Sequence, residues 1–317
     1  MIPEAELGNS GIRVTRLGFG ALPIGPVQAD VPIAQAARVI RRALELGVTF
    51  IDTAHTYGTY EHIRRAKAGW TGPLVIATKT PASSYEEAEE HVRFALDALD
   101  VEQLDIVMLH AHRLDERVFE ERAGAHACLV EYKAKGLVRA IGISTHRVSV
   151  VRAAAQRADI DVIHPLINVA GLGLLGGTAD DMAAAIRVAA ERGKGIYAMK
   201  ALGGGHLVPR REEAFRYVLG LPGVHAVAVG MVSEAEVDMN CRIFAGETIP
   251  PGEQEATLKR KRLKIVAQYC KGCGSCVEAC PNGALAIVDG KSRVDERACI
   301  LCGYCSPVCP EFAIRVI

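Results

Sequence analysis

The ten cysteines of this chain are very unevenly distributed, and their placement limits the possible folds more than any other feature. Only Cys128 and Cys241 lie in the first 269 residues, whereas the other eight lie between Cys270 and Cys309. Cysteines crowded at fixed spacing indicate metal binding rather than disulfides or scattered buried thiols. We therefore expect the 317 residues to form two modules, with a change in composition near residue 250.

The eight crowded cysteines form two copies of one motif. Each copy has three cysteines separated by two residues, followed after three more residues by a Cys-Pro pair. Three thiolates on one tight loop can bind a single cubane cluster, while the fourth turns away and binds the other cluster. This pattern predicts two [4Fe–4S] clusters. The first takes Cys270, Cys273, Cys276 and Cys309, and the second takes Cys299, Cys302, Cys305 and Cys280.

Structural zinc sites, which also use C-x-x-C pairs, are the alternative for these motifs. They give no reason for the repeated third cysteine or for the Cys-Pro pairs. The segment from about residue 259 to 317 resembles the bacterial two-cluster ferredoxin module. Cys128 and Cys241 stand alone on helical stretches, and we expect them to be small buried hydrophobic residues rather than catalytic thiols.

The first 245 residues alternate short apolar runs with longer amphipathic stretches. Runs that are apolar throughout are typical of parallel strands buried on both faces. Eight such units match a (β/α)₈ barrel better than an open doubly wound sheet. The sheet would need a glycine-rich fingerprint after its first strand, and residues 17–22 lack the third glycine. The expected strands are residues 17–20, 48–51, 74–78, 105–109, 138–143, 161–163, 196–199 and 226–229.

The predicted fold class is therefore α/β. A TIM barrel is expected over residues 1–250, followed over residues 251–317 by a linker and a small α+β ferredoxin-like domain. One helix is marked clearly, because Ser84 and Glu87 form a capping box. Its apolar stripe comprises Ala88, Val92, Ala95 and Leu99.

Chemistry in such barrels collects at the carboxyl ends of the strands. Asp52 and Tyr57 follow the second expected strand, Lys79 the third and His110 the fourth, so these four side chains should share one pocket. A tyrosine hydroxyl normally titrates near pH ~10, and a buried lysine beside it would lower that pKa. Asp52 would keep Lys79 charged, and His110 would orient a carbonyl group or relay a proton. His55 and His112 have no such support and are expected at the rim.

Four segments around these residues resemble the aldo-keto reductases: residues 50–61, 77–79, 104–110 and 141–144. The resemblance covers about residues 10 to 245. It implies an oxidoreductase that interconverts carbonyl compounds and alcohols, with Tyr57 as the general acid of a tetrad completed by Asp52, Lys79 and His110. It also implies that NADH or NADPH binds in an extended pose across the barrel mouth.

Several further positions match the family's nucleotide contacts only in part. Ser144 keeps the position that contacts the carboxamide, Thr145 stands where asparagine is usual, and His164 stands at a frequent glutamine position. Lys200 ends the seventh expected strand and is a candidate to line the pocket. We expect the cluster module to replace the family's usual C-terminal substrate loop.

The contacts to the nucleotide's 2′-phosphate depart further from the family. Gly230 and Glu236 replace the lysine and arginine that many NADPH-dependent members use, and an acidic Glu236 would repel that phosphate, so the specificity leans towards NADH. The complete set of expected cofactor contacts is Gly20, Ser144, Thr145, His164, Lys200, Gly230, Ser233, Glu236 and Asn240.

The charge balance limits the partners. With 37 basic and 37 acidic residues, nucleic acid is not expected as a partner. The longest uncharged window, residues 162–179, contains a proline and four glycines and is expected to be a loop, so no membrane span and no export signal are expected, and a cytoplasmic location follows.

Two other functional classes remain open. An electron-transfer subunit would use the barrel to dock a one-electron redox partner, and a regulatory protein would sense oxygen or iron through loss of its clusters. The tetrad favours an enzyme acting on a small carbonyl or alcohol substrate. No flavin motif is visible, and the cluster module is expected to cover the barrel mouth.

Overall fold

A computed structural model describes residues 1–250, 252–253, 261–299, 301 and 303–317. In this part of the chain, eight parallel strands close into a barrel, with the last strand paired to the first. Each expected strand overlaps one of them, so the predicted TIM barrel is confirmed. The strands are β3 (Leu17–Gly20), β4 (Phe50–Asp52), β5 (Val75–Thr80), β6 (Leu104–His110), β7 (Val138–Thr145), β8 (Val162–Pro165), β9 (Gly195–Met199) and β10 (Ala226–Gly230).

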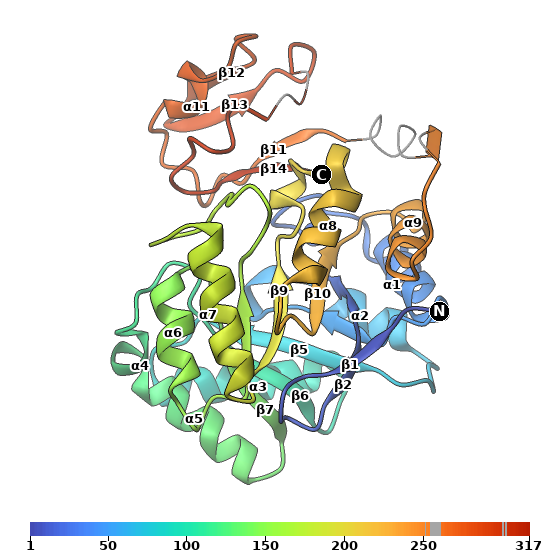
Figure 1. The fold of residues 1–317 in the computed structure, drawn as a ribbon, viewed down its shortest axis with the longest axis vertical. Helices are drawn as coiled ribbons and strands as arrows, with labels where there is room; N and C mark the ends of the chain where they lie inside the picture. Colours follow the sequence, from blue (N-terminus) through green and yellow to red (C-terminus); the bar gives the residue numbers. More distant parts are fainter. Residues whose placement is uncertain (251, 254–260, 300, 302) are drawn as a thin grey trace.

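Helices connect successive strands and surround the barrel (Figure 1). None of the helices in the described ranges has the length and apolar character needed to cross a membrane. The helices are α1 (Ile33–Glu45), α2 (Tyr60–Lys67), α3 (Tyr85–Leu99), α4 (Val118–Glu121), α5 (Ala123–Ala134), α6 (Val148–Ala155), α7 (Ala179–Glu191), α8 (Arg211–Gly220) and α9 (Glu234–Phe244).

Helix α3 shows how local sequence sets these elements. The Ser84 hydroxyl accepts a hydrogen bond from the backbone N–H of Glu87 at 3.2 Å, which satisfies one of the free donors of the first turn. The Glu87 carboxylate accepts from the backbone of Ser83 at 3.0 Å, one residue earlier than a capping box requires. The expected apolar stripe is buried: Ala88, Val92, Ala95 and Leu99.

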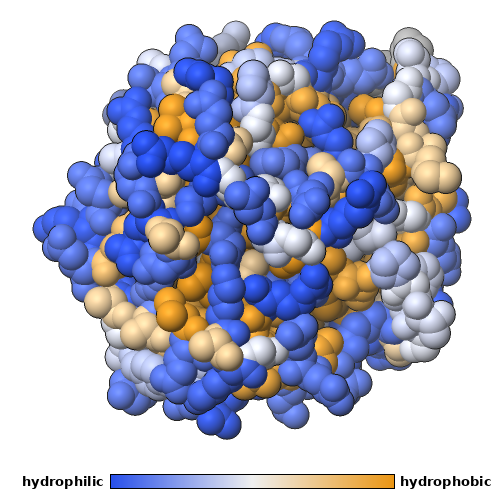
Figure 2. Space-filling view, turned by 60° about the horizontal axis from the view of Figure 1, so that its bottom comes forward, coloured by the Kyte–Doolittle hydropathy of each residue, from blue (hydrophilic) through white to orange (hydrophobic). Residues whose placement is uncertain are grey.

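The lower end of the barrel is closed by a hairpin of β1 (Glu4–Glu6) and β2 (Arg13–Thr15). Leu7, Ile12 and Val14 of this region pack into the same apolar cluster as the side chains inside the barrel. Figure 2 shows the molecule with this end turned forward, where hydrophilic residues cover much of the surface and apolar residues lie between them. The polar side chains expected to be catalytic lie at the other end.

The cluster module lies above that other end (Figure 1). Within its described residues, the module contains two antiparallel strand pairs and one helical turn. They are β11 (Leu263–Ile265) with β14 (Ile314–Val316), β12 (Leu285–Val288) with β13 (Lys291–Val294), and α11 (Ser275–Glu278).

Strand β14 brings the C-terminal part of the chain back onto the barrel mouth, against the 3-10 turn η3 (Gly203–Gly205) that follows β9. Gly205 has a φ of +96°, and a Cβ atom there would lie 2.0 Å from the carbonyl oxygen of Val316. Only glycine permits both this backbone conformation and this close approach. The module therefore docks on a surface that the barrel sequence has shaped for it.

Candidate active site and cluster cavities

Asp52 and Lys79 form a buried ion pair at the carboxyl ends of β4 and β5. The Lys79 ammonium donates hydrogen bonds to Oδ1 and Oδ2 of Asp52 at 2.7 and 2.8 Å, and to the carbonyl oxygen of Thr53 at 2.7 Å. Both side chains are almost completely buried. Burial lowers the pKa of Lys79, and the negative charge of Asp52 opposes that effect. Each N–H of the ammonium thus has an acceptor, which is what a buried charge requires.

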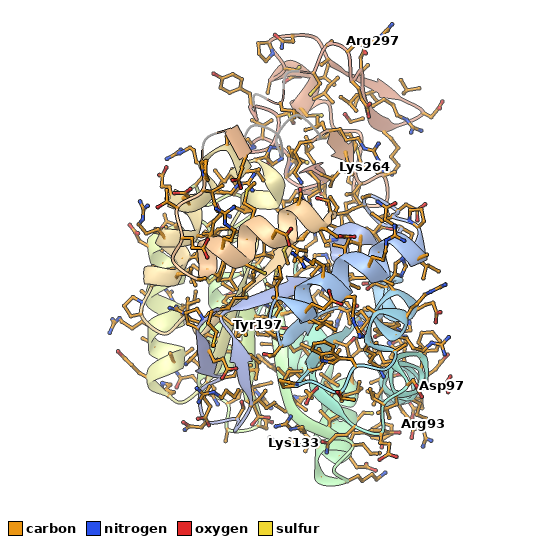
Figure 3. All side chains as sticks on the ribbon, turned by 90° about the vertical axis from the view of Figure 1, so that its right-hand side faces the viewer. Arg93, Asp97, Lys133, Tyr197, Lys264 and Arg297 are labelled. Carbon is orange, nitrogen blue, oxygen red and sulfur yellow. The ribbon has the colours of Figure 1, made fainter. Side chains whose placement is uncertain are left out.

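Tyr197 of β9 is a further member of this group that the sequence does not predict. Its hydroxyl donates to Oδ1 of Asp52 at 2.8 Å from a completely buried position inside the barrel (Figure 3). His164 stacks on the Tyr197 ring at a centroid distance of 3.9 Å, and its Nδ1 lies 2.6 Å from the Tyr197 carbonyl oxygen. Asp52 is therefore fixed from two sides, by Lys79 and by Tyr197.

Tyr57 and His110 lie above this buried group. Tyr57 sits in the 3-10 turn η2 (His55–Tyr57) after β4, and its ring meets the His110 ring edge to face at 5.7 Å. The Lys79 ammonium lies 4.9 Å from the centroid of the Tyr57 ring. The structure thus brings Asp52, Tyr57, Lys79 and His110 together at the barrel mouth.

The electrostatics of Tyr57 differ from the sequence-based expectation. Burial, and next the charge of Asp52, raise the pKa of Tyr57 well above its usual value. The expectation of a lowered pKa is wrong for this structure, because burial and the charge of Asp52 outweigh the Lys79 ammonium, which is hydrogen-bonded to Asp52 and Thr53. Burial and then the charge of Lys79 lower the pKa of His110 well below its usual value. At neutral pH, Tyr57 keeps its proton and His110 is uncharged.

Replacing Tyr197 with phenylalanine is expected to lower kcat roughly tenfold, because the lost hydrogen bond to a charged acceptor is worth ~1.5–3 kcal/mol. Tyr197 lines neither cavity described below, so it acts by positioning Asp52. The phenylalanine ring keeps the stack on His164, which isolates the contribution of the hydroxyl. Steady-state kinetics should show the loss in kcat, with nucleotide affinity unchanged in equilibrium titrations. An unchanged kcat would contradict a positioning role.

A cleft of about 130 Å³, here called the nucleotide cleft, opens beside Tyr57 at the barrel mouth. Gly230 is needed at its wall, because a Cβ atom there would lie 2.4 Å from Pro23. Among the expected cofactor contacts, the cleft is lined by Gly20, His164, Lys200, Gly230 and Glu236.

Two other expected contacts carry spare hydrogen-bonding capacity. The Ser144 hydroxyl and the Asn240 amide oxygen are buried and have no hydrogen-bond partner in the described structure. A buried polar atom without a partner is costly, and a bound nucleotide would satisfy both. Thr145 differs, because its hydroxyl accepts the backbone N–H of Arg147 at 3.0 Å. Ser144 lies at the cavity beside Tyr57 and His110, and Asn240 lies in α9, so these free polar atoms fit a nicotinamide nucleotide that extends along the barrel mouth beyond the cleft.

Glu236 is not an isolated negative charge. It forms a largely buried ion pair with Lys261 of the C-terminal region and accepts the backbone N–H of Val232 at 2.8 Å. Glu236 and Lys261 line both the nucleotide cleft and a neighbouring cavity of about 550 Å³. Ser233 caps helix α9 at this point, with its hydroxyl accepting from the backbone of Glu236. The sequence identifies Glu236 as a repelling charge, but the structure supplies a cation beside it.

A second cavity of about 300 Å³, here called the interface cavity, lies between the barrel and the cluster module. His112, which is expected at the rim, follows β6 and lines this cavity from the barrel side. His55 does not line it and stacks instead on His91 at 3.6 Å. The charged and aromatic side chains of its wall are Tyr57, His110, His112, Arg113, His146, Lys200, Tyr269, Glu311, Phe312 and Arg315.

The cysteines of the module surround two small cavities. The described cysteines fall into two groups, and Cys302 lies outside the described residues. One cavity is lined by Cys270, Cys273, Cys276 and Cys309, and the other by Cys280, Cys299 and Cys305. Each cavity thus combines cysteines from both copies of the motif.

The cysteine sulfur atoms lie in surroundings that suit an iron–sulfur cluster. Backbone N–H groups point at the sulfur atoms: Ser292 donates to Cys270, Ala284 to Cys280 and Ala313 to Cys309, each at 3.3 Å. Such hydrogen bonds stabilise the negative charge of iron–sulfur sites. The remaining cysteines, Cys128 and Cys241, are buried in α5 and α9.

Comparison with known proteins gives two family matches. The model for the aldo/keto reductase family matches residues 16–215, and the model for the 4Fe-4S dicluster domain matches residues 262–310. Each match lies on one of the two parts expected from the sequence.

Individual relatives are similar over part of the chain. L-galactose dehydrogenase of Arabidopsis thaliana is 32% identical over 152 residues, which are 44% of this chain and 47% of that protein. Pyridoxine 4-dehydrogenase of Escherichia coli strain K12 is 32% identical over 179 residues, which are 50% of this chain and 62% of that protein. The chain thus spans less than two thirds of either relative. An aldo-keto reductase from Bacillus halodurans, solved in its holo form, shares the fold with a TM-score of 0.66 at 21% identity, covering 82% of this chain and 96% of that chain.

Proposed function

Because the chain belongs to the aldo/keto reductase family, we propose that this oxidoreductase interconverts a small carbonyl compound and its alcohol, with Tyr57 as the general acid. One observation carries the proposal: Tyr57 and His110 share a cavity directly above the buried pair of Asp52 and Lys79. We place the catalytic barrel at residues 1–250 and the linker and cluster module at residues 251–317.

A bound nicotinamide supplies the hydride for this chemistry. Tyr57 donates the proton of its hydroxyl to the carbonyl oxygen, and its raised pKa ensures that the proton is present at neutral pH. The Lys79 ammonium lies near the Tyr57 ring and stabilises the negative charge that this transfer leaves on the phenol oxygen. Uncharged His110 can orient the carbonyl oxygen by donating a hydrogen bond. Asp52 keeps Lys79 charged and in place.

The chain's own residues would hold the nucleotide along the barrel mouth. Ser144 would contact the carboxamide, and Asn240 would contribute a further polar contact. Gly20 and Gly230 line the cleft with backbone only, because neither has a side chain. The ion pair of Glu236 and Lys261 stands where the nucleotide cleft meets its neighbouring cavity.

We expect NADH to bind at least as tightly as NADPH, because Glu236 disfavours a 2′-phosphate and Lys261 is already engaged by it. Glu236→Gln should raise NADPH affinity relative to NADH roughly tenfold, since it removes the anion and frees Lys261. Lys261→Met should instead lower the affinity for NADPH relative to that for NADH. Equilibrium titrations at several salt concentrations measure both. A clear NADPH preference in the unmodified protein would contradict the proposal.

The enzymatic function can be tested on anaerobically purified full-length protein. NADH and a panel of small aldehydes and ketones are mixed, and nucleotide oxidation is followed by its absorbance while the alcohol is identified by chromatography. Turnover of at least one carbonyl compound supports the proposal. Tight nucleotide binding without turnover of any class of carbonyl compound would oppose it.

A second candidate role is one-electron transfer through two [4Fe–4S] clusters to an external redox partner. The observation that favours it is the position of Cys309, which lines both the first cluster cavity and the interface cavity that contains Tyr57. The clusters would carry single electrons to or from the interface cavity.

Without added flavin, NADH is expected to reduce the clusters slowly or not at all, because a hydride carries two electrons together and each cluster accepts one. Dithionite should reduce them readily. Cluster absorbance recorded after anaerobic mixing with each reductant measures the difference. Rapid stoichiometric bleaching by NADH in flavin-free protein would contradict this expectation.

A further inference from the structure

The interface cavity holds two positive charges that no described carboxylate neutralises. Lys200 follows β9 of the barrel, and Arg315 lies in β14 of the module, where its side chain is buried. The other cations near the cavity are compensated, since Lys79 pairs with Asp52 and Arg113 pairs with Glu311. Within the described ranges, neither Lys200 nor Arg315 has an ion pair.

Both charges line the interface cavity that contains Tyr57 and His110, and both also line the nucleotide cleft. The Lys200 ammonium is 2.9 Å from Nε2 of His146, and it lies 4.8 Å from the centroid of the Phe312 ring. The Arg315 guanidinium stacks on the same ring at 4.1 Å. His146 and Phe312 line the interface cavity and do not line the nucleotide cleft. The Phe312 ring therefore holds the two cations together next to the cavity that Tyr57 and His110 share.

Two side chains at the cavity have buried polar atoms without a hydrogen-bond partner in the described structure. Nε of Arg315 is buried and has no partner in the described structure, and Nη1 donates only to the carbonyl oxygen of Ile314 at 2.9 Å. The buried hydroxyl of Ser306, which also lines the cavity, has no partner. A buried guanidinium with so few acceptors is costly unless a ligand supplies them.

The backbone is also strained at this place. Lys200 has a φ of +60° and Phe312 a φ of +45°, a region that residues other than glycine rarely adopt. Such strain persists where the surrounding structure requires a side chain in one position, and it concentrates at ligand sites. Here the strained residues are Lys200 itself and Phe312, whose ring contacts both cations.

The electrostatics of Lys200 favour an anion beside it. Burial, and then the charges of Arg315 and Arg113, lower the pKa of Lys200 well below its usual value. An anion between Lys200 and Arg315 would offset this repulsion. The thiolate of Cys309 is near enough to act on Arg315, so a cluster is a competing explanation for that residue. A cluster does not account for Lys200, because the Lys200 ammonium faces His146.

We propose that Lys200 and Arg315 bind the anionic group, a carboxylate or a phosphate, of a small carbonyl substrate whose reacting carbon lies at Tyr57. This inference rests on the proposed function and adds the substrate class. Arg315 comes from the cluster module, so the module completes the substrate site of the barrel. The cavity of about 300 Å³ limits the substrate to a small molecule.

The first test uses the unmodified, cluster-loaded protein with pairs of substrates that differ in charge. Succinic semialdehyde is compared with butanal, and glyceraldehyde 3-phosphate with glyceraldehyde. The anionic member of at least one pair should have a kcat/KM roughly ten- to hundredfold higher, the value of one or two charge-assisted hydrogen bonds. The pair with the larger ratio distinguishes a carboxylate from a phosphate. Equal values within both pairs would overturn the inference.

The second test uses variants that remove each charge but keep the bulk, Lys200→Met and Arg315→Met. Each should reduce the anionic-to-neutral ratio of kcat/KM at least tenfold, and Arg315→Lys should restore part of it. Arg293→Met is the matched control, because Arg293 is an exposed arginine of β13 outside both cavities. If Arg315→Met disrupts folding or cluster content, the Lys200 variant and the unmodified protein still decide the question.

A third measurement does not depend on turnover. Succinate and inorganic phosphate are added to the NADH-bound protein, and the melting temperature is recorded with succinamide as the neutral control. At least one anion should stabilise the unmodified protein, and Lys200→Met should lose this effect. If the anions bind without turnover of any carbonyl compound, the proposed function fails and the anion site stands. If neutral carbonyls turn over but neither anion stabilises the protein, the inference fails alone. A loss of NADH affinity in Arg315→Met equal to its loss of anion affinity would assign Arg315 to the nucleotide phosphates and overturn the proposal.

Discussion

Replacing Tyr57 with phenylalanine is expected to slow carbonyl reduction by roughly 10²–10⁴-fold, the usual loss when a general acid is removed. The phenylalanine ring still fits against His110, so the cavity and the nucleotide cleft keep their shape. The hydroxyl proton is needed only when the carbonyl oxygen becomes negative. Nucleotide affinity should therefore remain nearly intact, and kcat should carry the whole effect in steady-state and single-turnover measurements.

Two further variants make this result specific. Lys79→Met should cause a loss of similar size, because the buried carboxylate of Asp52 then lacks its counter-ion and the phenol oxygen lacks a nearby positive charge. Tyr132→Phe is the control, since Tyr132 is a buried tyrosine of α5 whose hydroxyl donates to Glu89 in the outer helical layer. Unchanged turnover in Tyr57→Phe would show that the tetrad does not carry the reaction.

The barrel could be predicted from the sequence because each of its signals is local. A strand buried on both faces must be apolar at every position, and a helix covering it must show an apolar stripe every three or four residues. The stripe of α3, from Ala88 to Leu99, follows this rule and is buried. Asp52, Lys79 and His110 could be placed at one end because parallel strands all point the same way.

The remaining site residues could not be predicted, because their roles depend on contacts between distant parts of the chain. Tyr197 lies 145 residues from Asp52 in sequence, and its inward direction becomes clear only when the barrel is closed. A tyrosine within an otherwise apolar strand is the single signal that points to it. The raised pKa of Tyr57 likewise follows from burial and from the direction of the Lys79 hydrogen bonds, which the residue types alone do not specify.

The contribution of the cluster module to the barrel could not be predicted from the sequence either. Arg315 lines both cavities, and Lys261 lines the nucleotide cleft, because β14 and β11 lie across the barrel mouth. The spacing of the cysteines determines how the module folds around its clusters, but it contains no information about the face that docks. Glycine at position 205 is a feature of the barrel that reflects this docking, and the need for it becomes clear only beside the carbonyl group of Val316.

Replacing Cys309 with alanine is expected to remove one cluster and leave the other, so that iron falls from about eight to about four atoms per chain. The reason is the crossed arrangement, in which Cys309 of the second motif lies at the cavity formed by Cys270, Cys273 and Cys276 of the first. Cys280→Ala should have the same effect on the other cluster, because Cys280 lies with Cys299 and Cys305. Iron and sulfide analysis of anaerobically purified protein measures both losses.

The identity of the lost cluster separates the crossed arrangement from two independent motifs. In the crossed arrangement, Cys309→Ala and Cys273→Ala remove the same cluster and leave the same spectrum in electron paramagnetic resonance after reduction. In independent motifs, Cys309→Ala would instead match Cys299→Ala. Cys128→Ala is the control and should keep full iron, since Cys128 is buried in α5 of the barrel. Because Cys309 also lines the interface cavity, its loss should in addition change the kinetics of the anionic substrates, whereas loss of Cys280 should affect them much less.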